Sequence, residues 1–178
     1  MSNICVFIHE LKIGGAERQS ILLCKALKQH HNVTFVVLNP KNTDAQQQKL
    51  IEQEHIELTI LTGTKIQRFF QLLHLLRKNR IAILITFLAS DNVLGAIAGK
   101  LARVKYIVGG IRNSRIKTMK LIVAWAINRT LQNYTLFNNY AGRELFITRY
   151  GFSNRKCLVI QNLFYSEQKT IIRKPSQS

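Results

Sequence analysis

Short apolar runs alternate with helical patterns along almost the whole chain, and this alternation limits the folds available to it. The clearest run, residues 81–88, is apolar on both faces, which is typical of a central strand in a parallel sheet covered by helices. The other predicted strands are residues 3–9, 32–38, 56–61, 105–109, 134–138 and 157–160. Predicted helices span residues 16–30, 44–53, 66–80, 115–132 and 141–150, and one more is capped by Ser90, Asp91 and Asn92. The sequence therefore predicts an α/β fold with a doubly wound, mainly parallel sheet.

The first thirty residues predict an anion-binding corner. A buried strand is followed by a turn containing Gly14 and Gly15, and then by a helix. Glycines allow a tight turn, and the unpaired N–H groups at a helix start favour a phosphate or carboxylate. The pattern is neither Gly-x-Gly-x-x-Gly nor a P-loop, so a purely structural turn stays an alternative. Glu17 and Arg18 are either ligand contacts or exposed residues of the first helical turn.

Ligands of doubly wound sheets bind beyond the carboxyl ends of the strands. The first turn, the loop after residues 81–88 and the loop after residues 105–109 should meet there. We therefore expect Gly14, Gly15, Ser90, Arg112 and Asn113 to converge on one cleft.

Net charge is the unusual feature of the composition. The 178 residues include 26 Lys and Arg against 9 Asp and Glu, which gives a formal charge of +17. Asp91 is the only acidic residue between positions 58 and 143. Such a charge favours nucleic acid, an anionic membrane or a phosphorylated substrate as a partner, although a solvated basic surface is the alternative.

The helix of residues 66–80 combines apolar and basic side chains, as do helices that rest on anionic membranes. Its membrane-facing candidates are Lys65, Arg68, Phe69, Arg77 and Lys78. The alternative is a core-packing helix with a basic rim. The helix after residue 115 has the same ambiguity, because Lys117 and Lys120 precede an apolar run that contains Trp125.

The three cysteines, Cys5, Cys24 and Cys157, lie far apart in apolar patterns and predict buried free thiols in a reducing compartment. The chain contains no Asp-x-Asp and no second histidine four residues after His9, so we expect no metal site. No signal peptide or apolar run of ~18 residues is evident. We expect a cytoplasmic protein, and the basic helices suggest a peripheral position on the inner face of the membrane.

Several segments together resemble the family 4 glycosyltransferases, which have the GT-B fold of two facing Rossmann-like domains. The Gly-Gly-Ala-Glu-Arg sequence at residues 14–18 resembles the opening signature of the family. Residues 85–88 with Asn92 resemble its mid-domain segment, and residues 112–114 resemble its acceptor-site loop. Residues 159–162 resemble the segment that closes the N-terminal domain. The resemblance thus runs from about residue 3 to residue 162, in the correct order.

This resemblance implies that residues 1–162 are the acceptor-binding domain of a retaining transferase. Gly14 and Gly15 would face the diphosphate of a UDP- or GDP-sugar held mainly by a C-terminal domain. The acceptor would be a glycan or a lipid-linked glycan in surface polysaccharide synthesis. Three departures from the family pattern are Arg112 where many members have histidine, Gln161 in place of proline and Leu163 in place of glycine.

Family members carry a second Rossmann-like half with two glutamates that have seven residues between them, and no two glutamates here have that spacing. We therefore expect residues 163–178 to be a linker or tail towards a C-terminal domain supplied in cis or in trans. We expect no tightly bound cofactor and no transfer by the chain alone, since the diphosphate needs positive groups on both sides. The alternative is a non-catalytic basic module that binds anionic membrane or nucleic acid. The chain lacks clustered stacking aromatics, which disfavours nucleic acid.

Overall fold

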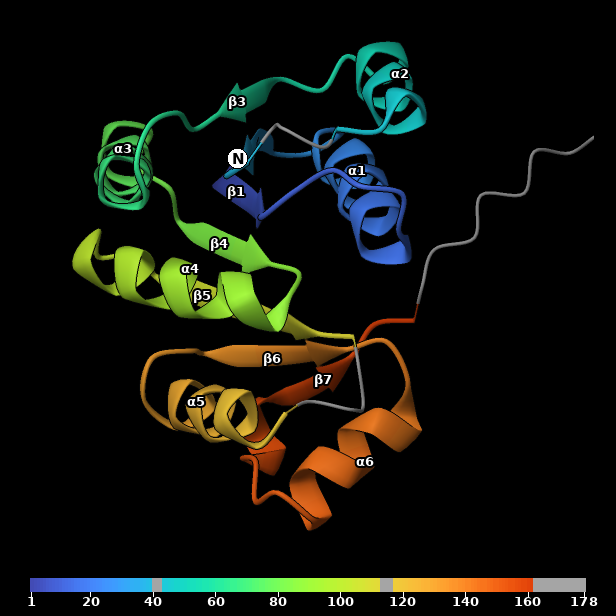
Figure 1. Ribbon diagram of the computed structural model, residues 1–178, viewed down its shortest axis with the longest axis vertical. Coiled ribbons are helices and arrows are strands. Elements are labelled where there is room, and N and C mark those ends of the chain that lie inside the picture. The colour runs from blue at the N-terminus through green and yellow to red at the C-terminus, as the bar shows by residue number, and fades with distance from the viewer. Residues whose placement is uncertain (40–42, 113–116, 162–178) are drawn as a thin grey trace, which may run out of the picture.

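The computed structural model describes residues 1–39, 43–112 and 117–161, and these form one seven-stranded sheet (Figure 1). The strands are β1 (Asn3–Ile8), β2 (Asn32–Val37), β3 (Leu58–Ile60), β4 (Ile83–Thr86), β5 (Tyr106–Ile111), β6 (Tyr134–Phe137) and β7 (Cys157–Val159). Their order is β3-β2-β1-β4-β5-β6-β7, and all neighbours are parallel. The predicted doubly wound sheet is confirmed. Its central strand is β4, which comes from the run that is apolar on both faces.

The direction of winding reverses between β1 and β4. From β1 the chain moves outward through β2 to β3, crosses back, and then moves the other way from β4 to β7. Phe7 is in register with Thr86, so the carboxyl ends of β1 and β4 lie side by side. In a doubly wound sheet this reversal leaves a crevice between the two sets of loops, where ligands bind.

Helices cover the sheet in two layers (Figure 1). They are α1 (Gly15–Leu27), α2 (Ala45–Gln53), α3 (Lys65–Lys78), α4 (Ala89–Leu101), α5 (Thr118–Thr130) and α6 (Tyr140–Thr148). One core cluster, which includes Val6, Ile8 and Ile21, packs α1 and α2 against one face of the sheet. A second joins α3, α4 and α5 to the opposite face through Cys5, Phe7 and Leu72. Because alternate residues of β1 enter different clusters, its uninterrupted apolar run follows from burial on both sides.

A third cluster holds α5 and α6 against β6 and β7. Phe146 of α6 is fully buried and contacts three aromatic rings, those of Phe137, Tyr150 and Phe152. After α6, Gly151 has a φ of +67°, the left-handed conformation that the sequence predicts at this helix end.

The beginning of α4 corrects one prediction. Ser90, Asp91 and Asn92 do not cap the helix, because the position before it is Leu88, which makes no side-chain cap. Asp91 and Asn92 are instead buried inside the first turn and bond to neighbouring elements. Before α2, Asp44 does cap the helix, since its carboxylate accepts from the N–H groups of Gln46 and Gln47.

The membrane-facing candidates of α3 differ in how far they are exposed. Phe69 packs against the core cluster beneath the helix, and Arg68 is half-buried. Lys65 and Lys78 are exposed, while Arg77 donates to the Leu101 carbonyl. The large apolar residues that α3 exposes are Ile66 and Phe70. In the part of the chain that the structure describes, no helix is long and apolar enough to span a bilayer.

The three cysteines are buried, as their apolar surroundings predict. Residues 162–178, which include the whole of the predicted tail, lie outside the described residues, as do Asn113 and Ser114 of the predicted acceptor loop.

Candidate functional site

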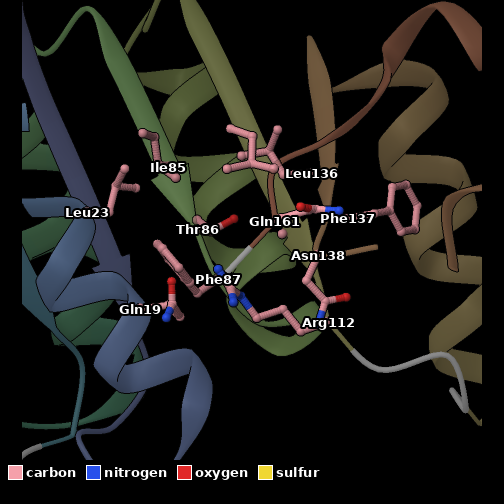
Figure 2. A pocket seen from close by; sticks show the side chains of 12 residues that line it. Gln19, Leu23, Ile85, Thr86, Phe87, Arg112, Leu136, Phe137, Asn138 and Gln161 are labelled. Carbon is pink, nitrogen blue, oxygen red and sulfur yellow. The ribbon is translucent and has the colours of Figure 1, made fainter. Parts of the chain in front are cut away.

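A small hollow lies beyond the carboxyl ends of β4, β5 and β6, beside α1 (Figure 2). Its walls are Gln19 and Leu23 of α1 and the strand residues Ile85, Gly110 and Leu136. Arg112, one residue after β5, lies at the same hollow with Asn138 and Gln161. The hollow offers about 50 Å³, whereas pockets that enclose a small-molecule ligand usually offer roughly 300–1,000 Å³. It therefore forms part of a site and does not enclose a whole ligand.

Arg112 gives this hollow a positive charge. Its guanidinium carbon lies 4.6 Å from the centre of the Phe87 ring, and Figure 2 shows the side chain extending towards Phe87 and Gln19. Burial lowers the pKa of the guanidinium from its ordinary value, and the negative charge of Glu17 opposes that shift. Even so, arginine stays charged in proteins. A cation stacked on an aromatic ring at a crevice rim can hold a phosphate or carboxylate through paired N–H groups.

A second hollow of about 210 Å³ adjoins the first on the α6 side. Arg112, Phe137 and Asn138 line both, and the second is also lined by residues at the start of α6, among them Asn139 and Gly142. Arg112 thus stands between two hollows, and a ligand that contacts it could extend into either.

Asn92 fixes the floor of the crevice. The Thr86 hydroxyl donates to its side-chain oxygen, and its amide nitrogen donates to the Gly110 carbonyl at 3.0 Å. A Cβ added to Gly110 would lie 2.9 Å from the carbonyl oxygens of both Thr86 and Phe87, so only glycine fits this close approach. One buried amide therefore joins the end of β4, the start of α4 and the end of β5.

We predict that Asn92→Ala lowers the free energy of unfolding by about 1–3 kcal/mol, because it removes the buried bond to the Gly110 carbonyl and leaves the Thr86 hydroxyl only the Val108 carbonyl as an acceptor. Urea unfolding followed by circular dichroism measures this. Asn32→Ala is the matched control, since its side chain makes an exposed bond to Asn3 and should cost less than about 0.5 kcal/mol. Equal costs for the two variants would contradict the role given to Asn92.

His9 and Asp91 form a pair at the point where the winding reverses. The His9 backbone N–H donates to Asp91 Oδ2 at 3.0 Å, and the Ser90 hydroxyl donates to Oδ1 at 3.1 Å. The imidazole Nδ1 lies 3.9 Å from Oδ1, and the His9 side chain is 43% exposed while that of Asp91 is fully covered. Burial raises the pKa of Asp91 to about 7, and the charges of Glu17 and Glu10 add to the shift. A carboxyl group that titrates near neutrality thus lies beneath the crevice.

The diglycine lies in a separate hollow. Gly14, Gly15 and Arg18 line a depression between α1 and α2, together with Gln47 and Lys49. Gly14 has an extended backbone, and neither glycine has positive φ, so the turn does not use their special conformational freedom. A Cβ on Gly15 would meet nothing within 4 Å, and one on Gly14 would meet only the end of the Glu17 side chain. The glycines leave the backbone at the start of α1 open to a ligand group.

The expected convergence of five residues is only partial. Arg112 lies in the crevice hollow, Gly14 and Gly15 lie in the hollow beside α2, and Ser90 is exposed and bonded to Asp91. Asn113 is outside the described residues. Glu17 links the two regions, because it lies next to Gly14 and its charge acts on Arg112.

Sequence reasoning missed Gln19, Asn138 and the pair of His9 with Asp91. Asn138 follows β6 directly, so the rule used for the loops after β4 and β5 could have found it. Gln19 lies one helical turn beyond Gly15 and could also have been found. The pairing of His9 with Asp91 joins residues 82 positions apart, and it depends on β1 lying beside β4.

The fold and the crevice define a class of domain. A doubly wound parallel sheet that is open at the carboxyl ends of its strands is a Rossmann-like domain. Residues 12–132 match the family described as "Glycosyl transferase 4-like", and the chain belongs to that family. No curated protein sequence matches the chain.

Solved structures with the same fold include several glycosyltransferases and a UDP-N-acetylglucosamine 2-epimerase. HepE from Anabaena, crystallised with UDP and glucose, has a TM-score of 0.80 and 20% identity over 92% of this chain and 45% of its own. A glycosyltransferase from Rickettsia africae has a TM-score of 0.69 and 13% identity over 90% of this chain and 43% of its own. The lipopolysaccharide outer core galactosyltransferase WaaB has a TM-score of 0.62 and 15% identity over 90% of this chain and 45% of its own. The chain thus spans less than half the length of each.

Proposed function

We propose that the chain is the acceptor-binding half of a glycosyltransferase that moves a sugar from a nucleotide-sugar donor to a glycan or lipid-linked acceptor in surface polysaccharide synthesis. The observation that carries this proposal is the positively charged hollow around Arg112 at the carboxyl ends of the strands, in a chain of this family. HepE binds UDP and glucose, and WaaB acts on the lipopolysaccharide outer core, which supports a sugar donor and a surface glycan.

The proposed roles follow from where the charges lie. Arg112 would hold an anionic group of the acceptor or of the donor, and the open backbone at Gly14 and Gly15 would face the donor diphosphate. The hollow of about 50 Å³ needs a facing wall, which we assign to a C-terminal domain that holds most of the UDP- or GDP-sugar. A departing diphosphate is stabilised by fixed positive groups on both sides. The retaining stereochemistry implied by the resemblance is part of this proposal.

The purified chain should therefore transfer no sugar by itself. Release of UDP or GDP from nucleotide sugars, measured with and without an added donor-binding domain from a family member, tests this. Transfer that appears only with the added domain supports the proposal. Transfer by the chain alone would show that the second wall is not needed.

We predict that Arg112→Gln weakens the binding of a phosphorylated acceptor analogue, such as a short-chain prenyl diphosphate sugar, by roughly 10- to 100-fold. Isothermal titration calorimetry on the purified chain measures this change. Arg129→Gln is the matched control, because Arg129 lies on α5, stacks on Trp125 and bonds to the Gly151 carbonyl. The role of Arg112 would be disproved by equal affinities for the wild type and Arg112→Gln, or by equal losses in both variants.

A further inference from the structure

The hollow between α1 and α2 is the largest of the three hollows described above, and it shares no lining residue with the crevice hollow. It offers about 560 Å³, which lies within the roughly 300–1,000 Å³ of pockets that enclose a small-molecule ligand. One face of α2, with residues at the i, i+3, i+4, i+7 spacing, contributes Gln46, Lys49, Leu50 and Gln53. Unlike the hollow at the crevice, this one has room for a whole ligand group.

Gln47 lines this hollow and carries a covered side-chain oxygen that needs a hydrogen-bond donor. The residue is 8% exposed, and its Oε1 has no hydrogen-bond partner among residues 1–39, 43–112 and 117–161. Covered polar atoms nearly always have a partner, because leaving one unpaired costs free energy. An amide oxygen only accepts. A ligand bound here should therefore bring an O–H or N–H group to Gln47.

The charged residues that line the hollow are both positive. Arg18 and Lys49 are exposed on its two sides, one on α1 and the other on α2, and no carboxylate lines it in the described part of the chain. Glu17 lies beside Gly14, and its charge acts on Arg112 at the crevice. Two cations on facing helices favour a ligand with a carboxylate or phosphate between them.

These two requirements together define the class of ligand. A simple anion can pair with Arg18 and Lys49, but it offers only acceptors and cannot donate to Gln47. A neutral sugar offers hydroxyl donors and leaves both cations without a partner. A nucleotide base binds by stacking on aromatic rings, and the described lining contains none. An acidic sugar offers both a carboxylate and hydroxyl groups, and the exposed Ile13 at the rim can pack against its C–H face.

The first turns of α1 separate this hollow from the crevice. Arg18 lines the hollow on the α2 side, and the next residue, Gln19, lines the crevice hollow (Figure 2). Figure 1 shows α2 beside α1. A helix with its side chains is about 10 Å across, so a short oligosaccharide that passes the start of α1 can reach both hollows.

We propose that the hollow between α1 and α2 binds an acidic sugar residue of the acceptor glycan. Arg18 and Lys49 pair with its carboxylate, and one of its hydroxyl groups donates to Gln47 Oε1. The reacting end of the same glycan lies at the crevice. The identity of this glycan as an acceptor rests on the proposed function, whereas its binding to the hollow can be measured without any transfer.

Titration of the whole chain with two tetrasaccharides tests the proposal. The acidic probe alternates glucuronate with N-acetylglucosamine, and the neutral probe contains N-acetylglucosamine alone. We expect the acidic probe to bind roughly tenfold more tightly and to lose affinity at high salt. In ¹H–¹⁵N spectra it should shift the backbone amide signals of Gly15, Arg18 and Gln47.

A pair of charge substitutions separates local pairing from the overall positive charge of the chain. Arg18→Gln with Lys49→Gln should weaken binding of the acidic probe roughly tenfold or more, to the level of the neutral one. Lys65→Gln with Lys78→Gln on α3 is the matched control, because it removes the same charge at two exposed positions. This control should bind as the wild type does.

Gln47→Leu tests the covered oxygen. It should weaken binding of both probes about fivefold, because the hydroxyl loses its acceptor. The midpoint of urea unfolding should not fall, since the substitution removes a polar atom that the free chain leaves unpaired. Gln48→Leu is the control on the same helix, since the exposed Gln48 side chain bonds to Glu52. A lower unfolding midpoint with unchanged binding would assign Gln47 a purely structural role and contradict the proposal.

Three further results would overturn the proposal. One is equal affinity for the two probes, or no binding of either up to about 10 mM. Another is loss of the acidic probe in Arg112→Gln but not in the Arg18 and Lys49 variant, which would move the acidic sugar to the crevice and leave the proposed function in place. The third is binding of UDP-glucose that depends on Arg18 and Lys49 without binding of the acidic probe, which would assign the hollow to the donor diphosphate.

Discussion

Asp91→Asn should make the protein more stable above neutral pH, by up to about 4 kcal/mol. Burial raises the pKa of this carboxyl group from an ordinary value of 3.8 to about 7. Below pH 4 the carboxyl group keeps its proton in both the folded and the unfolded chain. The free energy of unfolding is then at its highest with respect to this group, because no buried charge has to be formed. As pH rises through 7 the buried carboxyl group has to ionise, and this contribution is lost. Asparagine stays neutral at every pH, so the variant avoids that loss.

The measurement is the difference in free energy of unfolding between wild type and Asp91→Asn, from urea titrations between pH 4 and 8. The difference should be small at pH 4, because the asparagine oxygen can still accept from the His9 N–H. Ser90→Ala serves as a second variant. Its hydroxyl bond lowers the pKa of Asp91, so its removal should steepen the loss of stability with pH. A difference that does not change with pH would show that Asp91 keeps its charge when buried.

Phe146→Ala should lower the free energy of unfolding by about 3–5 kcal/mol. The side chain is fully buried, and its ring centre lies 5.0–5.2 Å from those of Phe137, Tyr150 and Phe152. Alanine would leave a cavity where α6 meets β6 and β7, and the cost includes both lost burial and lost ring contacts. Since a domain of this size is stable by only about 5–15 kcal/mol, the third core cluster should open before the rest.

Urea unfolding followed by circular dichroism gives the total loss, and Trp125 fluorescence reports on the third cluster through its bond to the Gly151 carbonyl. Tyr140→Ala is the control on the same helix, because its side chain is 68% exposed and its removal should cost less than about 0.5 kcal/mol. A loss below about 1 kcal/mol in Phe146→Ala would mean that the surrounding rings close the cavity.

Much of the fold could be predicted because its signals are local. The apolar run that became β4 predicts a strand buried on both faces, and the alternation of strands and helices predicts crossovers in a parallel sheet. Asp44 before α2 and Gly151 after α6 are signals of the same local kind, since a cap and a left-handed residue act within one helical turn.

The candidate site was harder to predict because its residues act across elements. Asn92 is of a residue type that often caps helices, but its side-chain amide bonds to Thr86 and to Gly110, and Gly110 is 18 positions away. The sequence predicts a tight turn at Gly14 and Gly15, but it does not reveal that neither glycine has positive φ there, since an extended residue can also precede a helix. Phe69 and Phe70 are indistinguishable by type, and only the orientation of α3 on the sheet decides which ring is buried.

The sequence by itself determined which elements are strands and which are helices, their order, the parallel arrangement of the strands, and the family. These follow from periodicity and short motifs, which depend on neighbours along the chain. Only the tertiary structure decided that Arg112 and the diglycine occupy different hollows, that Asp91 is buried beneath His9, and that Gln47 is buried at the hollow between α1 and α2. These features depend on how β1, β4 and the helices pack together. Packing joins residues from distant positions, and no pattern within a single segment records it.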